Sequence, residues 1–173
     1  MFVLFGVSTV APAAGTCHEI VAALASQTTV PVRKVLIEGI RSDPLPTPAE
    51  LIRTVAEEVI RHSGPTGVVR LAPHAWALAL TNEDVGEFVR TTMRGLREAW
   101  REYAERMVAH GWLPPETDTD AVAKTLLSLL PGFILQHLAL GDVAADTIAR
   151  GVDALIPIRV TAVADQEGEL RAL

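Results

Sequence analysis

The sequence predicts an all-α protein, a bundle of helices around one core. Apolar residues recur three and four positions apart through most of the chain, which is the spacing of one helix face. Cap and break residues separate these runs, and the alternation of apolar and polar residues that is typical of strands is weak. A length of 173 residues suffices for one domain with a proper core.

The first well-marked helix is expected to begin at Pro48 and to end at Ser63-Gly64-Pro65. Thr47 is the expected N-cap, and Glu50 follows it by three residues, so that the two can form a capping box. Proline suits the first helical position because its missing N–H has no helical partner there. A one-sided stripe predicts the buried face: Leu51, Ile52, Val55, Val59 and Ile60.

Two helices should follow, a short one over residues 71–80 and a long one over 82–110 that ends at Gly111. The apolar face of the long helix consists of Val85, Phe88, Val89, Thr92, Met93, Leu96, Trp100, Tyr103 and Met107. Its other face carries arginine and glutamate residues four positions apart, which indicates a solvated outer surface. We therefore expect this helix to be half buried.

Two further helices complete the predicted bundle. Pro114-Pro115 break the chain before a helix over residues 119–140, which Gly141 should close. Asp142 is then the expected cap of a last helix over residues 142–156. No stable element is expected beyond this helix.

Helix 119–140 is apolar around most of its circumference, and three interpretations compete: a membrane span, a core helix, or a helix shared between the core and a partner chain. A span needs about 20 consecutive apolar residues, and Pro131, Gln136 and His137 interrupt this run. A helix that is apolar all round is buried all round, so we expect no membrane contact but a homodimer through helices 119–140 and 142–156. The interface residues expected are Leu126, Leu127, Leu130, Ile134, Leu138, Ile148, Val152 and Leu155.

Pro131 predicts a kink and free space next to Phe133, because proline removes a helical hydrogen bond. A simple bend around the core, without a pocket, is the alternative. Gln136 and His137 need hydrogen-bond partners in so apolar a helix, either from a ligand or across the dimer. A small apolar ligand is expected, with these residues as candidates for its pocket: His74, Trp76, Phe88, Thr92, Met93, Leu96, Trp100, Tyr103, Phe133, Gln136 and His137.

Composition and motifs exclude several classes of function. The net charge of −6 argues against a broad nucleic-acid-binding surface. A single cysteine rules out a disulfide within the chain and a multi-cysteine metal site. The histidines are not at ligand spacing, and no metalloprotease, phosphate-loop or dinucleotide motif occurs. We expect neither an enzyme nor a metal or cofactor, and a cytoplasmic location because the apolar N-terminus lacks the positive residues of a secretion signal.

The order of these helices resembles the C-terminal ligand-binding and dimerisation domain of TetR-family transcriptional regulators. The matching stretches are TPAELIRTVAEEVI, APHAWALAL, a long helix ending in AHGWLP, and an LLSLLPGFILQ helix followed by LALGDVAADT. The resemblance covers residues 47–156, and we place the domain at 41–156, followed by a tail at 157–173. It implies a small-molecule-binding domain whose last two helices form a four-helix bundle across a dimer.

The resemblance is weakest at residues 1–40, where family members carry a helix-turn-helix. The stretch is interpreted as a truncated or degenerate helix-turn-helix remnant and a linker helix, because residues 1–32 hold one charged residue, Glu19. Weak DNA contacts could come from His18, Gln27, Thr28, Arg33 and Lys34. DNA binding is thus expected to be weak or absent; the alternatives are an intact repressor with an unusual helix-turn-helix, or a dimerisation or adaptor module without a ligand.

Overall fold

The computed structural model describes residues 31–156, and every described element is helical. Residues 31–41 form a helical segment. It is followed by α2 (Pro48–Arg61), the short 3₁₀ helix η1 (Val68–Leu71), α3 (Ala72–Ala79), α4 (Glu83–Ala109), α5 (Thr119–Leu140) and α6 (Ala145–Leu155). The predicted all-α class is confirmed. Most of the predicted helix-turn-helix remnant and the tail at 157–173 lie outside the described residues.

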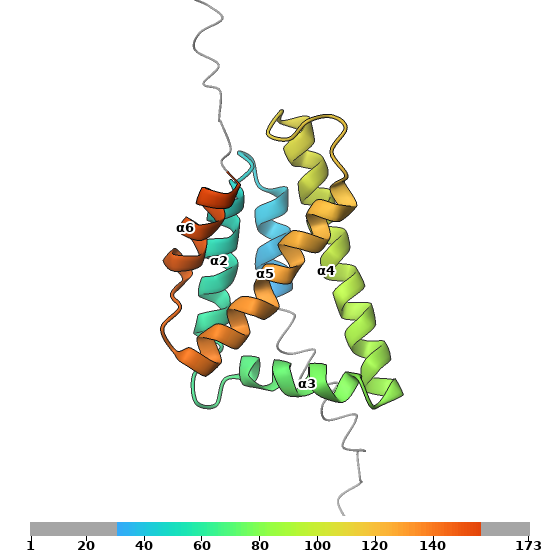
Figure 1. Cartoon of the computed structure of the whole chain (residues 1–173), viewed down its shortest axis with the longest axis vertical. Helices are drawn as coiled ribbons and strands as arrows, with labels where there is room; N and C mark the ends of the chain where they lie inside the picture. The colour runs from blue at the N-terminus through green and yellow to red at the C-terminus, as the bar shows by residue number, and fades with distance from the viewer. Residues whose placement is uncertain (1–30, 157–173) are drawn as a thin grey trace, which may run out of the picture.

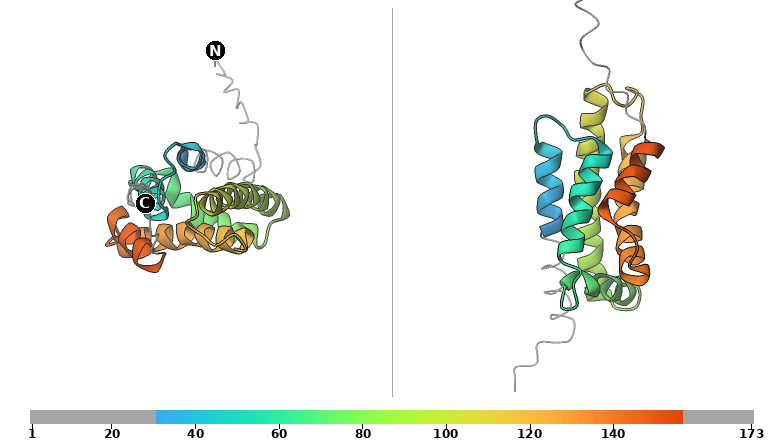
Figure 2. Two further views of the ribbon diagram at one scale, coloured as in Figure 1. Left: turned by 90° about the horizontal axis from the view of Figure 1, so that it is seen from above. Right: turned by 90° about the vertical axis from the view of Figure 1, so that its left-hand side faces the viewer.

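The helices form a bundle, and one of them, α3, lies across its end (Figure 1). α2 packs along α6, α4 packs along α5, and α2 also contacts α5. The helical segment 31–41 runs beside α2 in the views of Figure 2. α3 lies across the end of the bundle where α4 begins, and packs against α4.

The start of α2 is built as its sequence predicts. The backbone N–H of Glu50 donates to Oγ1 of Thr47 at 3.3 Å, and the backbone N–H of Thr47 donates to Oε2 of Glu50 at 2.8 Å. Both arms of the capping box are therefore present, with Pro48 in the first turn. They satisfy two donors that the helix itself cannot use.

Two hydrophobic clusters hold the bundle together. The first joins segment 31–41, α2, α4, α5 and α6, and its largest side chains, Trp100 and Tyr103, are fully buried. The second joins the end of α2, η1, α5 and α6 around Val59, Phe133 and Ala145. The stripes of the amphipathic helices thus meet in the interior, as their spacing predicts.

α5 runs without interruption through Pro131 and ends at Gly141, whose φ of +73° is the left-handed conformation that glycine adopts freely. α6 begins at Ala145 with Ala144 as its N-cap, so the prediction that Asp142 caps it was wrong. The backbone carbonyl of Val143 instead accepts a hydrogen bond from the His137 ring at 3.1 Å, which holds residues 142–144 as a connecting turn.

Among the described helices, α5 alone is long and apolar enough to cross a membrane by length and composition. It packs along α4 and belongs to both clusters, as a core helix does. Yet only 28% of its most apolar window is buried within the chain. α5 therefore presents a largely exposed outer face.

Candidate functional site

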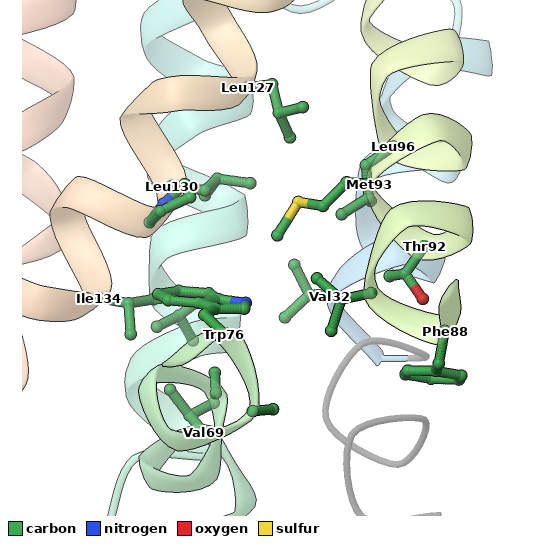
Figure 3. Close-up of a pocket in the computed structure, with 15 residues that line it drawn as sticks. Val32, Val69, Trp76, Phe88, Thr92, Met93, Leu96, Leu127, Leu130 and Ile134 are labelled. Atoms are coloured by element: carbon green, nitrogen blue, oxygen red, sulfur yellow. The ribbon is translucent and has the colours of Figure 1, made fainter. Parts of the chain in front are cut away.

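A pocket opens between segment 31–41, η1 and helices α2, α3, α4 and α5 (Figure 3). Its cavity volume is about 80 Å³. Fifteen residues line it: Val32, Val59, Val69, Ala72, Ala75, Trp76, Phe88, Val89, Thr92, Met93, Leu96, Leu127, Leu130, Pro131 and Ile134. Side chains from six segments thus converge on one space.

The turn between α3 and α4 sets the geometry of the pocket floor. Asn82 caps α4 by accepting a hydrogen bond from the N–H of Val85 at 3.0 Å. The end of α3 passes so close to α4 that a Cβ on Gly86 would lie 2.9 Å from the carbonyl oxygen of Ala79. Only glycine fits this approach without a shift, and the approach places Trp76 of α3 opposite the first half of α4.

The pocket is almost purely apolar. None of the fifteen lining side chains is ionisable, and only the indole N–H of Trp76 and the hydroxyl of Thr92 are polar. Met93 reaches from α4 into the space towards Leu130 in Figure 3. The site is suited to binding an apolar molecule, and these side chains supply no acid, base or nucleophile of catalytic strength.

Five of the eleven predicted ligand-binding residues line this pocket: Trp76, Phe88, Thr92, Met93 and Leu96. Trp100 and Tyr103 lie further along α4 inside the first cluster, with their rings edge to face at 5.9 Å. The hydroxyl of Tyr103 donates to the backbone carbonyl of Pro46 at 2.6 Å. These two aromatic side chains pack the core rather than the pocket wall.

The remaining four predicted residues also lie away from the pocket. His74 and Gln136 are exposed to solvent. Phe133 is buried in the second cluster and stacks on the ring of His137 at 5.7 Å. His137 has both its partners within the chain, since its Nε2 lies 2.9 Å from Oγ of Ser63 and its Nδ1 bonds the carbonyl of Val143.

Ten lining residues were not predicted as ligand-binding: Val32, Val59, Val69, Ala72, Ala75, Val89, Leu127, Leu130, Pro131 and Ile134. The sequence left open whether Pro131 makes room for a pocket beside Phe133 or only bends the helix; Pro131 lines this pocket, and Phe133 does not. Ala72 and Ala75 carried a usable signal, because small residues next to Trp76 leave space on that face of α3. The valines gave no such signal, because the sequence does not distinguish a valine that lines a pocket from one that packs in the core.

The predicted interface residues divide between interior and surface. Leu126, Leu130, Ile134 and Val152 are buried within this chain. Leu127, Leu138 and Ile148 are partly buried, and Leu155 is 82% exposed. A second chain could therefore reach only the latter group in this arrangement.

Of the residues predicted to make weak DNA contacts, His18, Gln27 and Thr28 lie outside the described residues. Arg33 and Lys34 are exposed on segment 31–41, and Nζ of Lys34 lies 3.8 Å from a carboxylate oxygen of Glu38. Within residues 31–156, no group of three or more potential metal ligands occurs.

Comparison with known proteins identifies the domain that carries the pocket. Residues 48–157, more than half of the chain, match the family model of the BetI-type transcriptional repressor, C-terminal. No curated protein and no solved structure matches the chain. The matched region spans α2 to α6 and thereby contains most of the pocket wall. The chain belongs to the TetR family of transcriptional regulators, and residues 48–157 are its C-terminal regulatory domain.

Proposed function

We propose that residues 31–156 form the ligand-sensing and dimerisation unit of a cytoplasmic transcriptional regulator, which acts by binding a small apolar molecule rather than by catalysis. The observation that carries this proposal is the apolar pocket lined by α3, α4, α5 and segment 31–41. Pockets of this composition bind ligands mainly by removing apolar surface from water.

Val32 links the pocket to the N-terminal part of the chain. It is the pocket residue contributed by segment 31–41, which continues towards residues 1–30. A ligand changes the activity of a regulator only if it binds two helix arrangements with different affinity. Contact with Val32 gives the ligand a way to favour one position of segment 31–41 relative to α4 and α5.

Homodimerisation is the second part of the proposal, and the outer face of α5 supports it. A stripe of small and apolar residues runs along this face at spacings of three and four: Ala121, Thr125, Ser128, Gly132, Leu135 and Ala139. On α5, Leu135 is 49% exposed and Leu140 is 66% exposed, and on α6 Leu155 is 82% exposed. A Cβ on Gly132 would meet open space, so a partner helix could approach closely there.

The dimer is tested by placing a charge in this stripe. Leu135→Glu should convert the dimer to a monomer in light scattering, because a carboxylate at an apolar interface loses its hydration. Leu80→Glu is the matched control: Leu80 is 87% exposed at the turn between α3 and α4, far from the stripe in sequence. A wild-type chain that is monomeric at micromolar concentration contradicts the dimer, and a dimer that survives Leu135→Glu contradicts this interface.

Ligand binding is tested by thermal shift with a library of small apolar compounds, since a ligand stabilises the folded state by RT ln(1 + [L]/Kd). Ala75→Leu should abolish the shifts, because the larger side chain extends into the cavity. Ala77→Leu, on the exposed side of α3, is the control. If no compound stabilises the wild-type protein, a dimerisation or adaptor module is the better description.

DNA binding by this chain is proposed to be weak or absent. The acidic net charge of −6 and the pairing of Lys34 with Glu38 support this view. A salt-dependent gel shift with the DNA upstream of its own gene tests it. Specific retardation at physiological salt would instead identify an intact repressor with an unusual helix-turn-helix.

A further inference from the structure

We infer that the pocket selects an uncharged, mainly apolar molecule with a hydrogen-bond acceptor, and that the indole N–H of Trp76 binds this acceptor. The inference rests on the proposed ligand-sensing function and adds the chemical class of the ligand. It follows from three features of the wall: its lack of charge, the orientation of Trp76 and the unbranched side chain of Met93.

The first feature excludes charged ligands. The fifteen lining residues include no Asp, Glu, Lys, Arg or His. A carboxylate or an ammonium group that entered the pocket would lose its hydration without gaining a charged partner. A neutral molecule has no comparable desolvation cost.

The second feature is the orientation of the Trp76 indole. Within residues 31–156, Nε1 of Trp76 has no hydrogen-bond partner, and Figure 3 shows the nitrogen-bearing edge of the indole turned across the pocket towards Val32. A donor that faces an apolar space remains unsatisfied unless a bound molecule or water supplies an acceptor.

The hydroxyl of Thr92 is a second polar group on the opposite wall. Two other threonines in this chain donate to the carbonyl four residues earlier, Thr54 to Glu50 and Thr125 to Ala121, both at 3.0 Å. Thr92 makes no such bond among the described residues, and its hydroxyl turns towards Phe88 in Figure 3. The Thr92 hydroxyl lies away from the Trp76 nitrogen, so one acceptor cannot bond both groups. We infer that the acceptor of the ligand bonds the N–H of Trp76.

The third feature concerns size. The present cavity of about 80 Å³ is smaller than the roughly 150 Å³ of an engineered cavity that accepts benzene. Met93 extends into the space from α4, and its unbranched thioether adapts readily to a new neighbour. A one-ring or two-ring molecule can enter when Met93 moves aside or when part of it remains in the open mouth.

Three probes of similar size test the inference: 1-indanone, which carries one carbonyl acceptor, indane, which carries none, and the cation phenyltrimethylammonium. The chain contains three methionines, so ¹³C-methyl labelling of methionine gives few resonances to assign. Met93 reports occupancy of the pocket, and Met107, 1% exposed in the first cluster, reports on the core. Titrations followed at Met93 yield Kd for each probe.

Trp76→Phe keeps an aromatic ring and removes the N–H. We expect this variant to bind 1-indanone with a Kd about threefold to tenfold higher, which is the value of one neutral hydrogen bond. Its Kd for indane should change by less than about twofold. Indane is intrinsically the more hydrophobic probe, so the ratio of the two Kd values in the wild-type protein alone is not informative. The readout is the change in this ratio between the wild-type protein and Trp76→Phe. Trp112→Phe makes the same chemical change outside the pocket and should alter neither Kd.

The outcomes separate this inference from the proposed function. If Trp76→Phe weakens both probes equally, or if phenyltrimethylammonium binds more tightly than 1-indanone, the acceptor inference is overturned while ligand binding stands. If no probe moves the Met93 resonance, both the inference and the ligand-sensing role fail. Selective loss of 1-indanone affinity in Trp76→Phe supports both.

Discussion

Replacing Tyr103 by Phe tests whether this side chain stabilises the core or contributes to ligand binding. Tyr103 is fully buried, and its hydroxyl donates to the carbonyl of Pro46 at 2.6 Å. Tyr103→Phe removes this bond and leaves the carbonyl without its donor. We expect a loss of about 1 kcal/mol in the free energy of unfolding at neutral pH, which corresponds to a Tm about 2–4 °C lower for a chain of this size.

The pH dependence gives the sharper test. Burial, and secondarily the negative charge of Glu50, raise the pKa of Tyr103 above its usual value of 10.0. Above that pH the unfolded chain loses the phenolic proton while the folded chain keeps it, so the wild-type protein loses stability as pH rises. The loss is about 1.4 kcal/mol per pH unit. The advantage of wild type over Tyr103→Phe should therefore vanish within about one pH unit above 10.

Urea denaturation of both proteins at pH 7, 9, 10 and 11 measures this difference, and groups common to both cancel. The chain has one tyrosine, so the ultraviolet absorbance of tyrosinate reports Tyr103 alone. A tyrosine that ionises near pH 10 in the folded protein, or a wild-type advantage that persists at pH 11, refutes the reasoning. The Kd of 1-indanone should be unchanged, because Tyr103 does not line the pocket.

Three further substitutions test local features of the fold, each by chemical denaturation. Thr47→Ala removes one arm of the capping box and should cost about 1 kcal/mol, so an unchanged stability would contradict the cap. Gly67→Ala should cost more, at least about 1–3 kcal/mol, because its Cβ would lie 2.2 Å from the backbone oxygen of His62; a neutral effect would argue against that close approach. His137→Phe keeps the stacking on Phe133 but removes two hydrogen bonds, and we expect a loss of about 1–3 kcal/mol together with faster amide exchange at the start of α6. Exchange that stays as slow as in wild type would show that His137 does not fix that turn.

Features set by neighbouring residues were predictable from the sequence. The capping box of α2 involves residues three positions apart, and Gly141 ends α5 as expected. The start of α6 was not predictable in this way, because the competing interaction comes from His137 in the preceding helix. That bond uses the backbone of Val143 and leaves the helix to begin at Ala145.

The pocket was only half predictable, for a geometric reason. The apolar stripe of α4 is continuous, and its spacing identifies the buried face correctly. The first half of that face meets α3 and the pocket, whereas Trp100 and Tyr103 continue into the closed core. Periodicity gives the direction of a side chain around its helix axis but not what lies opposite it.

α5 illustrates the same limit and leads to a last prediction. Leu130 and Ile134 lie on its inner face against the pocket, while Ser128, Gly132 and Leu135 alternate with them on the outer face. A helix moves as a unit, so a ligand that displaces the inner wall also displaces the proposed dimer surface. Binding and dimerisation should therefore be coupled, and linkage requires the coupling to be reciprocal.

The measurement is the Kd of 1-indanone in monomeric Leu135→Glu against the wild-type dimer, both followed at Met93. Leu135 is absent from the pocket wall, so a direct effect of the substitution on the ligand is not expected. Coupling between sites in proteins is typically about fivefold or more in affinity, and we expect a change of at least that order. Leu80→Glu leaves the proposed dimer surface unchanged, so its Kd for 1-indanone should equal that of the wild-type protein. Equal Kd values in monomer and dimer would mean that α5 transmits no information between its two faces, and that the pocket acts through segment 31–41 alone.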